Sequence, residues 1–405
     1  MYLTKEEEAI LEGEDGHASQ CAMSILVALG DLFGADKLIP IKSAHIAGVS
    51  YKTLGDAPID FLEKFKEERA KAQVYSTLNP CGLDIKNWTK MPVSKSFYKA
   101  QLRIINLYAS LGIESTLTCT PYYLRKIRKG AHIAWSESSA ISYANSVLGA
   151  RTNREGGPSS LAAALIGKTP YCGLHLDENR KGNHLVDVRT SLKCSADYSA
   201  VGVMVGQATK IKVPVFSGLE ECRRNWLKSL GAGMAASGAV SLFHVKGVTP
   251  EWPLREDIDV WHEGRPEEIT IIDKRQLNKA YSSLTTSFID LPDLAFIGCP
   301  HCSVKEIEQI TRMIKNRKVK RGVRLWLCTS RHVKSLAEKI GLIRRLEAAG
   351  VEVYCDTCII VTWLKEAGID SIITNSGKAA YYAPSFNKVE VVFDKLEDII
   401  KKVTK

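Results

Sequence analysis

The sequence predicts a protein of the α/β class, in which helices cover largely parallel sheets. Within residues 291–405, short apolar segments rich in Val, Ile and Leu alternate with longer segments of amphipathic, helical periodicity. Short connections separate the two kinds of segment. Neighbouring parallel strands need a crossover of a dozen or more residues, usually a helix, so this alternation indicates βα units around a parallel sheet.

The predicted elements of this region follow one another in a regular order. We expect strands over 294–298, 323–329, 351–355, 370–374 and 389–393. We expect helices over 303–316, 332–350, 359–368 and 396–403. The helix over 332–350 ends at Gly350, and glycine is favoured at helix C-termini because it adopts left-handed backbone angles without strain.

The middle of the chain shows the same alternation of strand-like and helical segments, but less clearly. We expect strands over 198–206, 214–219 and 238–248, with a helix over 220–237. Neither a repeat of fixed period nor a low-complexity linker marks a boundary. We place subdomain boundaries near residues 135 and 290, so that the expected subdomains are 1–135, 136–290 and 291–405.

Composition and charge restrict the class of protein. The 405 residues are 45% hydrophobic and 25% charged, as is ordinary for a globular protein. The acidic segment Met1–Asp15 lacks the basic start of a secretory signal, and no stretch has the roughly 20 apolar residues of a membrane span. We therefore expect a cytoplasmic protein without membrane contact. The net charge is +10, but the basic residues are not accompanied by aromatic side chains on which bases could stack, which disfavours nucleic-acid binding. A basic surface favours a small anionic substrate.

Several cysteines lie at the ends of predicted strands. Disulfides are rare in reducing compartments, so the eleven cysteines are expected to be free thiols. Cys119, Cys299 and the pair Cys355 and Cys358 each follow a strand-like segment. Ligands of parallel α/β sheets bind beyond the carboxyl ends of the strands, where helix N-termini converge. The sequence therefore offers three cysteine-bearing strand ends that could share one edge of the fold.

The closely spaced pair Cys299 and Cys302 admits four interpretations: a redox disulfide, half of a zinc site, an iron–sulfur ligand, or buried thiols without a role. Zinc is disfavoured because residues 303–354 separate this pair from the next, far more than the roughly 15 to 20 residues of a zinc ribbon. A thiol–disulfide oxidoreductase fits the strand–CPHC–helix order. It would also need an antiparallel hairpin and a cis-proline, whereas the pattern continues as βα units.

An iron–sulfur cluster needs thiolates that converge from separate parts of the fold. Cys119, Cys299 and one of Cys355 and Cys358 would meet that need. Three thiolates on a four-iron cluster leave one iron open. That iron can bind a substrate hydroxyl and act as a Lewis acid for the loss of water.

Two other loops have the composition of ligand-binding turns. Asn375, Ser376 and Gly377 lie between a predicted strand and a probable helix, where backbone N–H groups can cradle a phosphate beside Lys378. A tight turn that requires glycine explains this loop equally well. Residues 41–51 end a strand-like segment in small residues, which permit close approach of a ligand.

Five segments together resemble the aconitase X family. They are CTPYY (119–123), SESSAISYANSVLGARTNREGGPS (136–159), GCPHCS (298–303), DTCIIV (356–361) and NSGKAAYYAP (375–384). The resemblance extends over nearly the whole chain, and the long 136–159 block makes it specific. It implies an aconitase-like fold of repeated three-layer α/β/α domains, and an oxygen-sensitive [4Fe–4S] cluster.

The resemblance also implies roles for individual residues. The cluster ligands would be Cys119, Cys299 and Cys358, with Cys302 dispensable. The residues that correspond to a substrate-binding rim and anion loop are Gly48, Val49, Ser50, Asn79, Pro80, Ser138, Ser139, Asn375, Ser376 and Gly377. Related dehydratases take the proton with a base on a swivelling domain of about 130 residues. We find no counterpart to that domain here, so we expect no catalytic base in this chain and a separate small subunit that supplies it.

The activity that the resemblance implies is dehydration of (R)-5-phosphomevalonate to trans-anhydromevalonate 5-phosphate in the archaeal mevalonate pathway of isoprenoid biosynthesis. Dehydration of 3-hydroxyproline is the alternative within the same family. The thiol–disulfide oxidoreductase remains a more distant alternative. The expected partners are therefore a small subunit, in a heterodimer or higher assembly, and a small anionic substrate.

Overall fold

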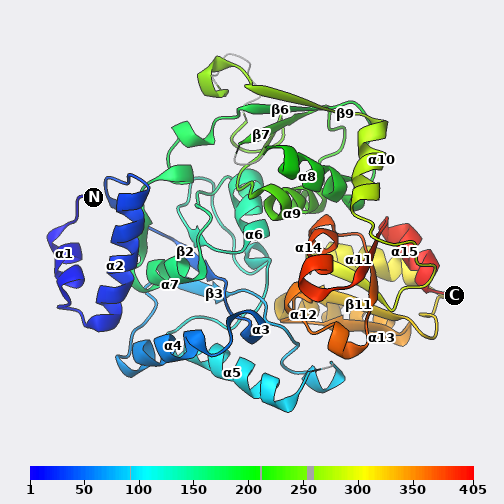
Figure 1. The fold of residues 1–405 in the computed structure, drawn as a ribbon, viewed down its shortest axis with the longest axis horizontal. Coiled ribbons are helices and arrows are strands. Elements are labelled where there is room, and N and C mark those ends of the chain that lie inside the picture. Colours follow the sequence, from blue (N-terminus) through cyan, green and yellow to red (C-terminus); the bar gives the residue numbers. More distant parts are fainter. Residues whose placement is uncertain (92, 210–211, 253–259) are drawn as a thin grey trace.

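Three sheet-centred units surround the middle of the molecule in the computed structural model, which describes residues 1–91, 93–209, 212–252 and 260–405. The first unit holds β1–β5, the second β6–β9 and the third β10–β14. The three units meet near α6 and α14 (Figure 1). Apart from the short antiparallel pair β1–β5, the sheets are parallel, as the sequence predicts. No helix in the described part of the chain is long and apolar enough to cross a membrane.

The first unit is a small sheet, in the order β3-β2-β4, packed among helices. Its strands are β1 (Leu38–Pro40), β2 (Ser43–Ile46), β3 (Tyr75–Leu78), β4 (Ala134–Trp135) and β5 (Lys168–Pro170). Its helices are α1 (Lys5–Glu12), α2 (His17–Leu32), α3 (Tyr51–Leu54), α4 (Ala57–Glu67), α5 (Lys95–Ser110), α6 (Ser138–Tyr143) and α7 (Gly157–Ile166). Apolar side chains of α2, α4, α5 and α7 form one core with Ala44, Ile46 and Leu78 of the sheet.

The second unit has the sheet order β8-β7-β6-β9. Its elements are β6 (His184–Val188), α8 (Ser195–Thr209), β7 (Pro214–Ser217), α9 (Arg224–Gly238), β8 (His244–Val245), β9 (Glu268–Ile272) and α10 (Lys274–Ser283). The strand expected over 214–219 is confirmed as β7, and the helix expected over 220–237 is confirmed as α9. The strand expected over 238–248 shortens to β8.

One prediction in this unit is wrong, because residues 198–206 lie within the helix α8 and form no strand. This helix is buried on nearly all sides by its own sheet, α9 and α14. Its residues are therefore apolar or small all round, and they show none of the amphipathic periodicity that identifies a surface helix.

The third unit has five parallel strands in the order β12-β11-β10-β13-β14. Its strands are β10 (Leu294–Cys302), β11 (Arg324–Thr329), β12 (Val351–Tyr354), β13 (Ser371–Thr374) and β14 (Glu390–Phe393). Its helices are α11 (Val304–Ile314), α12 (Arg331–Lys339), α13 (Leu342–Ala348), α14 (Gly377–Asn387) and α15 (Leu396–Val403). The predicted alternation of strands and helices is confirmed here almost throughout.

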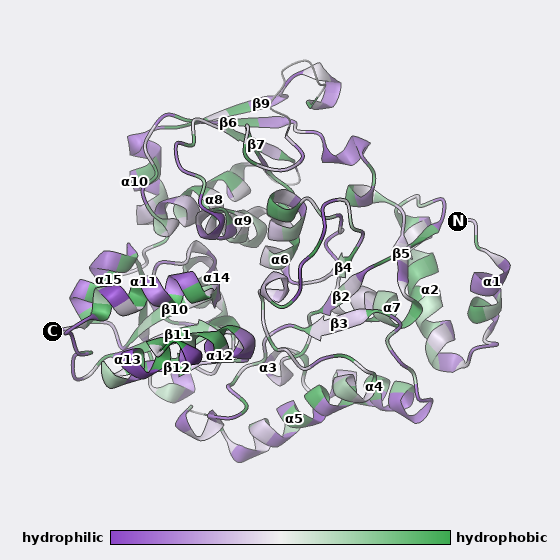
Figure 2. Ribbon diagram, turned by 180° about the vertical axis from the view of Figure 1, so that it is seen from behind, coloured by the Kyte–Doolittle hydropathy of each residue, from purple (hydrophilic) through white to green (hydrophobic). Residues whose placement is uncertain are grey.

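Alternate residues of the third sheet face opposite cores, as the pleat of a strand requires. Ala295 and Ile297 of β10 pack against α11, α12, α13 and α15, whereas Leu294 and Phe296 face α14 and the core of the first unit. In Figure 2, β10 and β11 are mostly green, while the surrounding helices carry both green and purple residues. The sheet is therefore buried on both faces.

Two helical predictions in this unit are corrected. Gly341, with a φ of 74°, divides the helix expected over 332–350 into α12 and α13. The helix expected over 359–368 is replaced by two 3₁₀ turns, Ile359–Val361 and Lys365–Ala367. Between them, the hydroxyl of Thr362 donates to the carbonyl oxygens of Cys358 and Gly82, at 2.9 and 3.2 Å, which ties this segment to the first unit.

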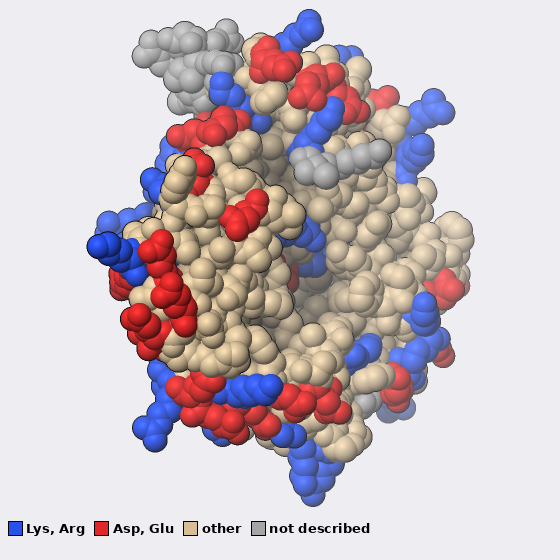
Figure 3. Space-filling view, turned by 60° about the vertical axis from the view of Figure 1, so that its left-hand side comes forward, with Lys and Arg blue, Asp and Glu red and all other residues tan. Residues whose placement is uncertain are grey.

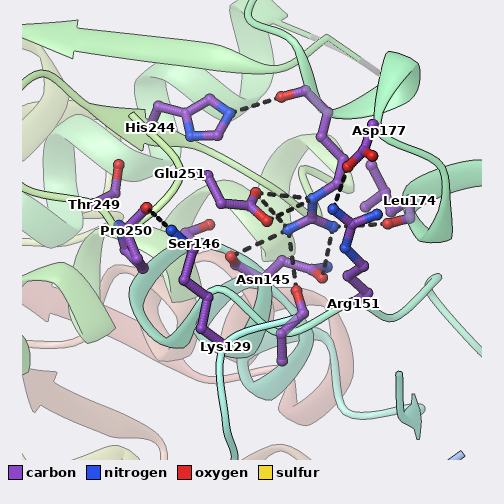
Figure 4. Close-up of polar contacts among 12 residues, drawn as sticks. Lys129, Asn145, Ser146, Arg151, Leu174, Asp177, His244, Thr249, Pro250 and Glu251 are labelled. Atoms are coloured by element: carbon purple, nitrogen blue, oxygen red, sulfur yellow. Dashed lines mark hydrogen bonds and ion pairs between the residues drawn. The ribbon is translucent and has the colours of Figure 1, made fainter. Parts of the chain in front are cut away.

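Buried ion pairs lie where the units meet. Arg180 donates to the carboxylate of Glu251 at 2.8 Å, and also to carbonyl oxygens of Leu174, Asn145 and Ala150. Figure 4 labels three of these acceptor residues, Glu251, Asn145 and Leu174, which lie close together. Such a network satisfies a buried cation with several acceptors, as burial of a charge requires.

Candidate iron–sulfur site

Cys299 lies at the end of β10, where the strand departs from regular pairing. The register with β11 shifts between Ile297 and Cys302, and Gly298 has a φ of 116°. A Cβ at Gly298 would lie 2.3 Å from the carbonyl oxygen of Cys328, so only glycine fits. The strand predicted over 294–298 is longer in the structure, because β10 continues through Cys299 to Cys302. A capping box between Ser303 and Glu306 then starts α11.

Cys358 lies in the loop that follows β12. The N–H of Cys358 donates to the carbonyl oxygen of Cys81 at 3.0 Å, and the N–H of Cys81 donates to that of Asp356 at 2.8 Å. The side chain of Asp84 accepts from the N–H of Cys355 at 2.7 Å. The loop that carries Cys355 and Cys358 is therefore fixed to the first unit.

Cys119 comes from the first unit and meets the third through His301. The N–H of His301 donates to the Cys119 Sγ at 3.2 Å. The His301 ring contacts the Thr118 hydroxyl through Nδ1 at 3.0 Å and the Thr357 carbonyl oxygen through Nε2 at 2.8 Å. Burial lowers the pKa of His301 to about 4, so the ring is neutral. This residue, which the sequence interpretation missed, joins the three cysteine-bearing segments.

The thiols of Cys119, Cys299 and Cys358 lie within electrostatic reach of one another. Burial is the largest cause that raises the pKa of each thiol, to about 12 for Cys358. The negative charge of Cys299 further raises the pKa of both Cys119 and Cys358, whereas Lys378 lowers all three. The structure thus brings the three predicted ligands together as protonated thiols, which would lose their protons on binding metal.

Cys302 and Cys355 differ from these three thiols in their surroundings. Cys302 is buried with Ile307 and Ile310 in the core between β10 and α11, whereas Cys299 and Cys358 pack against the core on the other face of the sheet. Cys355 is fully buried. Cys119, Cys299 and Cys358 are each partly exposed, as a site that must admit a cofactor requires.

A buried ion pair that the sequence interpretation missed lies beside the thiols. The Lys378 Nζ is 2.5 Å from the Glu137 Oε1, and it also donates to the Ser138 hydroxyl at 3.1 Å. Glu137 accepts from the Asn79 side chain at 2.9 Å and from the Ser139 hydroxyl at 2.8 Å. Despite burial, Lys378 and these donors lower the pKa of Glu137 to about 2. The sequence places Glu137 in the 136–159 block, but only the fold reveals its partner.

The predicted substrate rim is assembled from two loops of the first unit. Gly48 has a φ of 79° and is followed by Val49 and Ser50, which precedes α3. Asn79 and Pro80 follow β3. Within the described part of the chain, the buried Ser50 Oγ and Asn79 Oδ1 have no hydrogen-bond partner. Buried polar atoms without partners are rare, so both are available to a ligand.

The loop Asn375–Gly377 caps α14 and does not form the predicted cradle of backbone N–H groups. The Gly377 N–H donates to the Ser199 hydroxyl at 2.7 Å, and the Ser376 N–H donates to that of Thr374 at 3.2 Å. The Ser376 side chain caps the helix and also forms a hydrogen bond with Cys299. Polar side chains, and not backbone N–H groups, are therefore what this loop can offer an anion.

Two cavities bear on the location of the site. A small cavity of about 30 Å³ is lined by Cys299, Asn375, Ser376 and Lys228. A cavity of about 800 Å³, whose lining includes Asn153, Arg154 and Glu155, contains none of the three predicted ligands. The face in Figure 3 is hollowed at its centre, with positively charged side chains inside the hollow. Of these two cavities, the small one is lined by a predicted ligand and the large one is not.

The donor set fits a cluster better than a single ion. Among the described residues, no three His, Cys, Asp or Glu side chains are close enough together to hold one metal ion. A tetrahedral zinc ion, for example, brings its sulfur ligands to within roughly 4 Å of each other. In a four-iron cluster each cysteine binds a different iron, so the thiols surround the cluster. Cys299 of β10, Cys358 of the loop after β12 and Cys119 come from separate segments, which suits that arrangement. The strand-like segment predicted before Cys119 forms no strand.

Three family models match the chain in order. They are described as the first, second and third domains of aconitase X, and they match residues 1–178, 182–282 and 292–405. In overall structure, the chain matches the aconitase X of Thermococcus kodakaraensis in its holo-form with a TM-score of 0.91, at 47% identity and with 100% of both chains covered.

Curated relatives span the same length. A phosphomevalonate dehydratase large subunit of Methanocaldococcus jannaschii is 47% identical, over 99% of this chain and 100% of the relative. The protein of that name from Thermococcus kodakarensis is 48% identical with the same coverage. A cis-3-hydroxy-L-proline dehydratase of Pseudomonas aeruginosa is 33% identical, over 96% of this chain and 67% of that enzyme.

Proposed function

We propose a substrate, a cofactor and a partner for this chain, which belongs to the aconitase X family and is therefore a dehydratase, that is, a hydro-lyase. The substrate is (R)-5-phosphomevalonate and the product trans-anhydromevalonate 5-phosphate, in the mevalonate pathway. The observation that carries this proposal is the full-length similarity, at 47–48% identity, to relatives named phosphomevalonate dehydratase large subunit.

The cofactor is a [4Fe–4S] cluster held by Cys119, Cys299 and Cys358. When bound, such a cluster supplies a Lewis acid for the leaving hydroxyl through its open iron. The three partly exposed thiols support this assignment, because they come from separate segments and Cys299 acts on the pKa of both Cys119 and Cys358.

The substrate is held by the predicted rim and the Asn375–Gly377 loop. Ser50 and Asn79 have unpartnered buried polar atoms in the described structure. Ser138 accepts a hydrogen bond from Lys378, and Ser139 donates one to Glu137.

Elimination of water breaks a carbon–oxygen bond and removes a proton from the neighbouring carbon. Glu137 is a poor base for that proton, because its ion pair with Lys378 lowers its pKa to about 2. We therefore keep the base on a small subunit, and the "large subunit" in the names of the relatives supports such a partner.

The experiment is an assay of the anaerobically purified chain, alone and mixed with the small subunit, against phosphomevalonate and cis-3-hydroxyproline. We expect brown protein with iron near four per chain, and turnover of phosphomevalonate only in the mixture. If the mixture dehydrates cis-3-hydroxyproline and not phosphomevalonate, hydroxyproline is the substrate. Activity of the single chain would place the base here.

A thiol–disulfide oxidoreductase is tested on the same preparation. That activity requires a reversible bond between Cys299 and Cys302. Their side chains pack against cores on opposite faces of the sheet. Colourless protein that forms this disulfide reversibly would replace the dehydratase proposal.

A further inference from the structure

The ion pair of Glu137 and Lys378 joins two units at the site. Glu137 is the N-cap residue of α6 in the first unit, and Lys378 lies in the first turn of α14 in the third. Only 11% of the Glu137 side chain and 10% of the Lys378 side chain are exposed. The ion pair is therefore a buried polar contact between the first and the third unit.

The contacts of this pair are nearly saturated and link further residues of the site. The carboxylate accepts from Lys378, from Asn79 at 2.9 Å and from Ser139 at 2.8 Å, and the ammonium also donates to Ser138 at 3.1 Å. Both partners have the hydrogen bonds that a buried charge needs. Each side chain is thus held in one position.

The same two charges act on all three thiols. Glu137 raises and Lys378 lowers the pKa of Cys119, Cys299 and Cys358. Cys119 belongs to the first unit, as Glu137 does, whereas Cys299 and Cys358 belong to the third, as Lys378 does. The ion pair therefore connects the two parts of the fold that carry the cysteines.

Stability alone does not account for such a pair. Well-packed apolar residues of similar volume often replace a buried ion pair without loss of stability, because desolvation offsets much of the Coulomb attraction. A directional ion pair fixes the relative position of two elements more strictly than apolar packing does. Because the predicted ligands come from two units, an ion pair that fixes the relative position of these units would also fix the distances between the thiols.

We propose that Glu137 and Lys378 are positioning residues for the cluster: their ion pair holds Cys119 of the first unit at the distance from Cys299 and Cys358 that a shared cluster requires. The inference rests on the cluster of the proposed function. Residues that orient metal ligands contribute about 10- to 100-fold in metal affinity. We expect that range for loss of this pair.

The test compares Glu137→Gln with Glu251→Gln in the anaerobically loaded full chain. Glu251 is a matched control, since its side chain is 16% exposed and pairs with the buried Arg180. The groups that shift the pKa of Cys119, Cys299 and Cys358 include Glu137 and not Glu251. The readouts are iron per chain, the visible absorbance of the cluster, and the chelator concentration that removes half of the iron. The thermal midpoint of each cluster-free protein is measured in parallel.

We expect Glu137→Gln to release iron at about 10- to 100-fold less chelator than the parent, whereas Glu251→Gln releases it as the parent does. Lys378→Met should behave as Glu137→Gln does, and Lys378→Arg, which keeps the charge, should restore retention at least in part. Equal iron loss in both glutamate variants, in proportion to lowered thermal midpoints, would overturn the inference. So would full retention in Glu137→Gln.

The parent protein separates this inference from the proposed function. Iron near four per chain in the parent establishes that a cluster is present, and the variants then test only the positioning role. A parent without iron after anaerobic reconstitution would refute the cluster itself, and the inference with it. The cluster-free thermal midpoints show whether each variant folds.

Discussion

At the scale of single residues, the position of a thiol relative to the sheet separates a ligand from a packing residue. Cys299 and Cys302 are neighbours in sequence, yet they pack against cores on opposite faces of the third sheet. We predict that Cys302→Ala retains iron at the parent level, whereas Cys299→Ala loses the cluster. Iron analysis and visible absorbance after anaerobic loading give the result.

The choice between Cys355 and Cys358 is tested in the same series. We predict that Cys355→Ala keeps the cluster and Cys358→Ala loses it, because Cys355 is fully buried while Cys358 interacts with Cys299. The reverse result would exchange the two ligands. Equal loss in Cys302→Ala, Cys299→Ala and Cys358→Ala would contradict the ligand set as a whole.

Gly298 determines where Cys299 points. Its φ of 116° lies outside the range that other residues adopt easily, and an added Cβ would lie 2.3 Å from the Cys328 carbonyl oxygen. We predict that Gly298→Ala destabilises the protein by about 1–3 kcal/mol and lowers the iron content. Urea unfolding of the cluster-free protein measures the first effect. An unchanged unfolding midpoint would show that the strand end can relax.

Site residues could be predicted from the sequence where the neighbouring residues alone indicate a role. Cysteines after strand-like segments directed the prediction to Cys119, Cys299 and the pair Cys355 and Cys358, and the family resemblance then favoured Cys358. Glu137 and His301 were missed because their roles depend on partners far away in sequence, Lys378 and Thr118. The N–H cradle at Asn375–Gly377 was wrong for a similar reason, since Ser199 of α8 occupies the Gly377 N–H.

At the scale of elements, the fold was predictable where burial is one-sided. The helices of the third unit have one apolar face, so the period of their sequence identifies them. The helix α8 has no polar face, and its Val and Gly residues resemble a buried strand. The information that distinguishes the two lies in its packing partner α9, which local sequence does not contain.

The contact between α8 and α9 depends on glycines, which gives a prediction for this pair of helices. A Cβ at Gly238 would lie 1.9 Å from the Gly206 carbonyl oxygen. We predict that Gly238→Ala destabilises the protein by about 1–3 kcal/mol, as overpacking does. Gly156→Ala is the control, since its Cβ would meet its nearest atom at 3.8 Å. Similar unfolding midpoints for the two variants would contradict the close helix contact.

At the scale of the whole molecule, buried histidines make stability depend on pH. His45 and His244 are buried, and desolvation lowers the pKa of each from 6.5 to about 4. In the unfolded chain both would take up a proton near pH 6.5. As pH falls below 6.5, the unfolded state therefore binds more protons than the folded state, and the free energy of unfolding decreases until about pH 4. Asp356, whose pKa is raised to about 6, opposes this trend in part.

A single substitution isolates one histidine from these opposing contributions. His244 Nε2 lies 2.7 Å from the carbonyl oxygen of Arg180, and the side-chain amide of a glutamine, which reaches the same position, could donate to this oxygen without titrating. Between pH 7 and pH 5, a histidine whose folded pKa is about 4 contributes about 2 kcal/mol to the loss of stability. We predict that His244→Gln loses about that much less stability than the parent over this interval, in denaturant unfolding of the cluster-free chain at each pH. Parallel stability curves for the two proteins would contradict the lowered pKa of His244 in the fold.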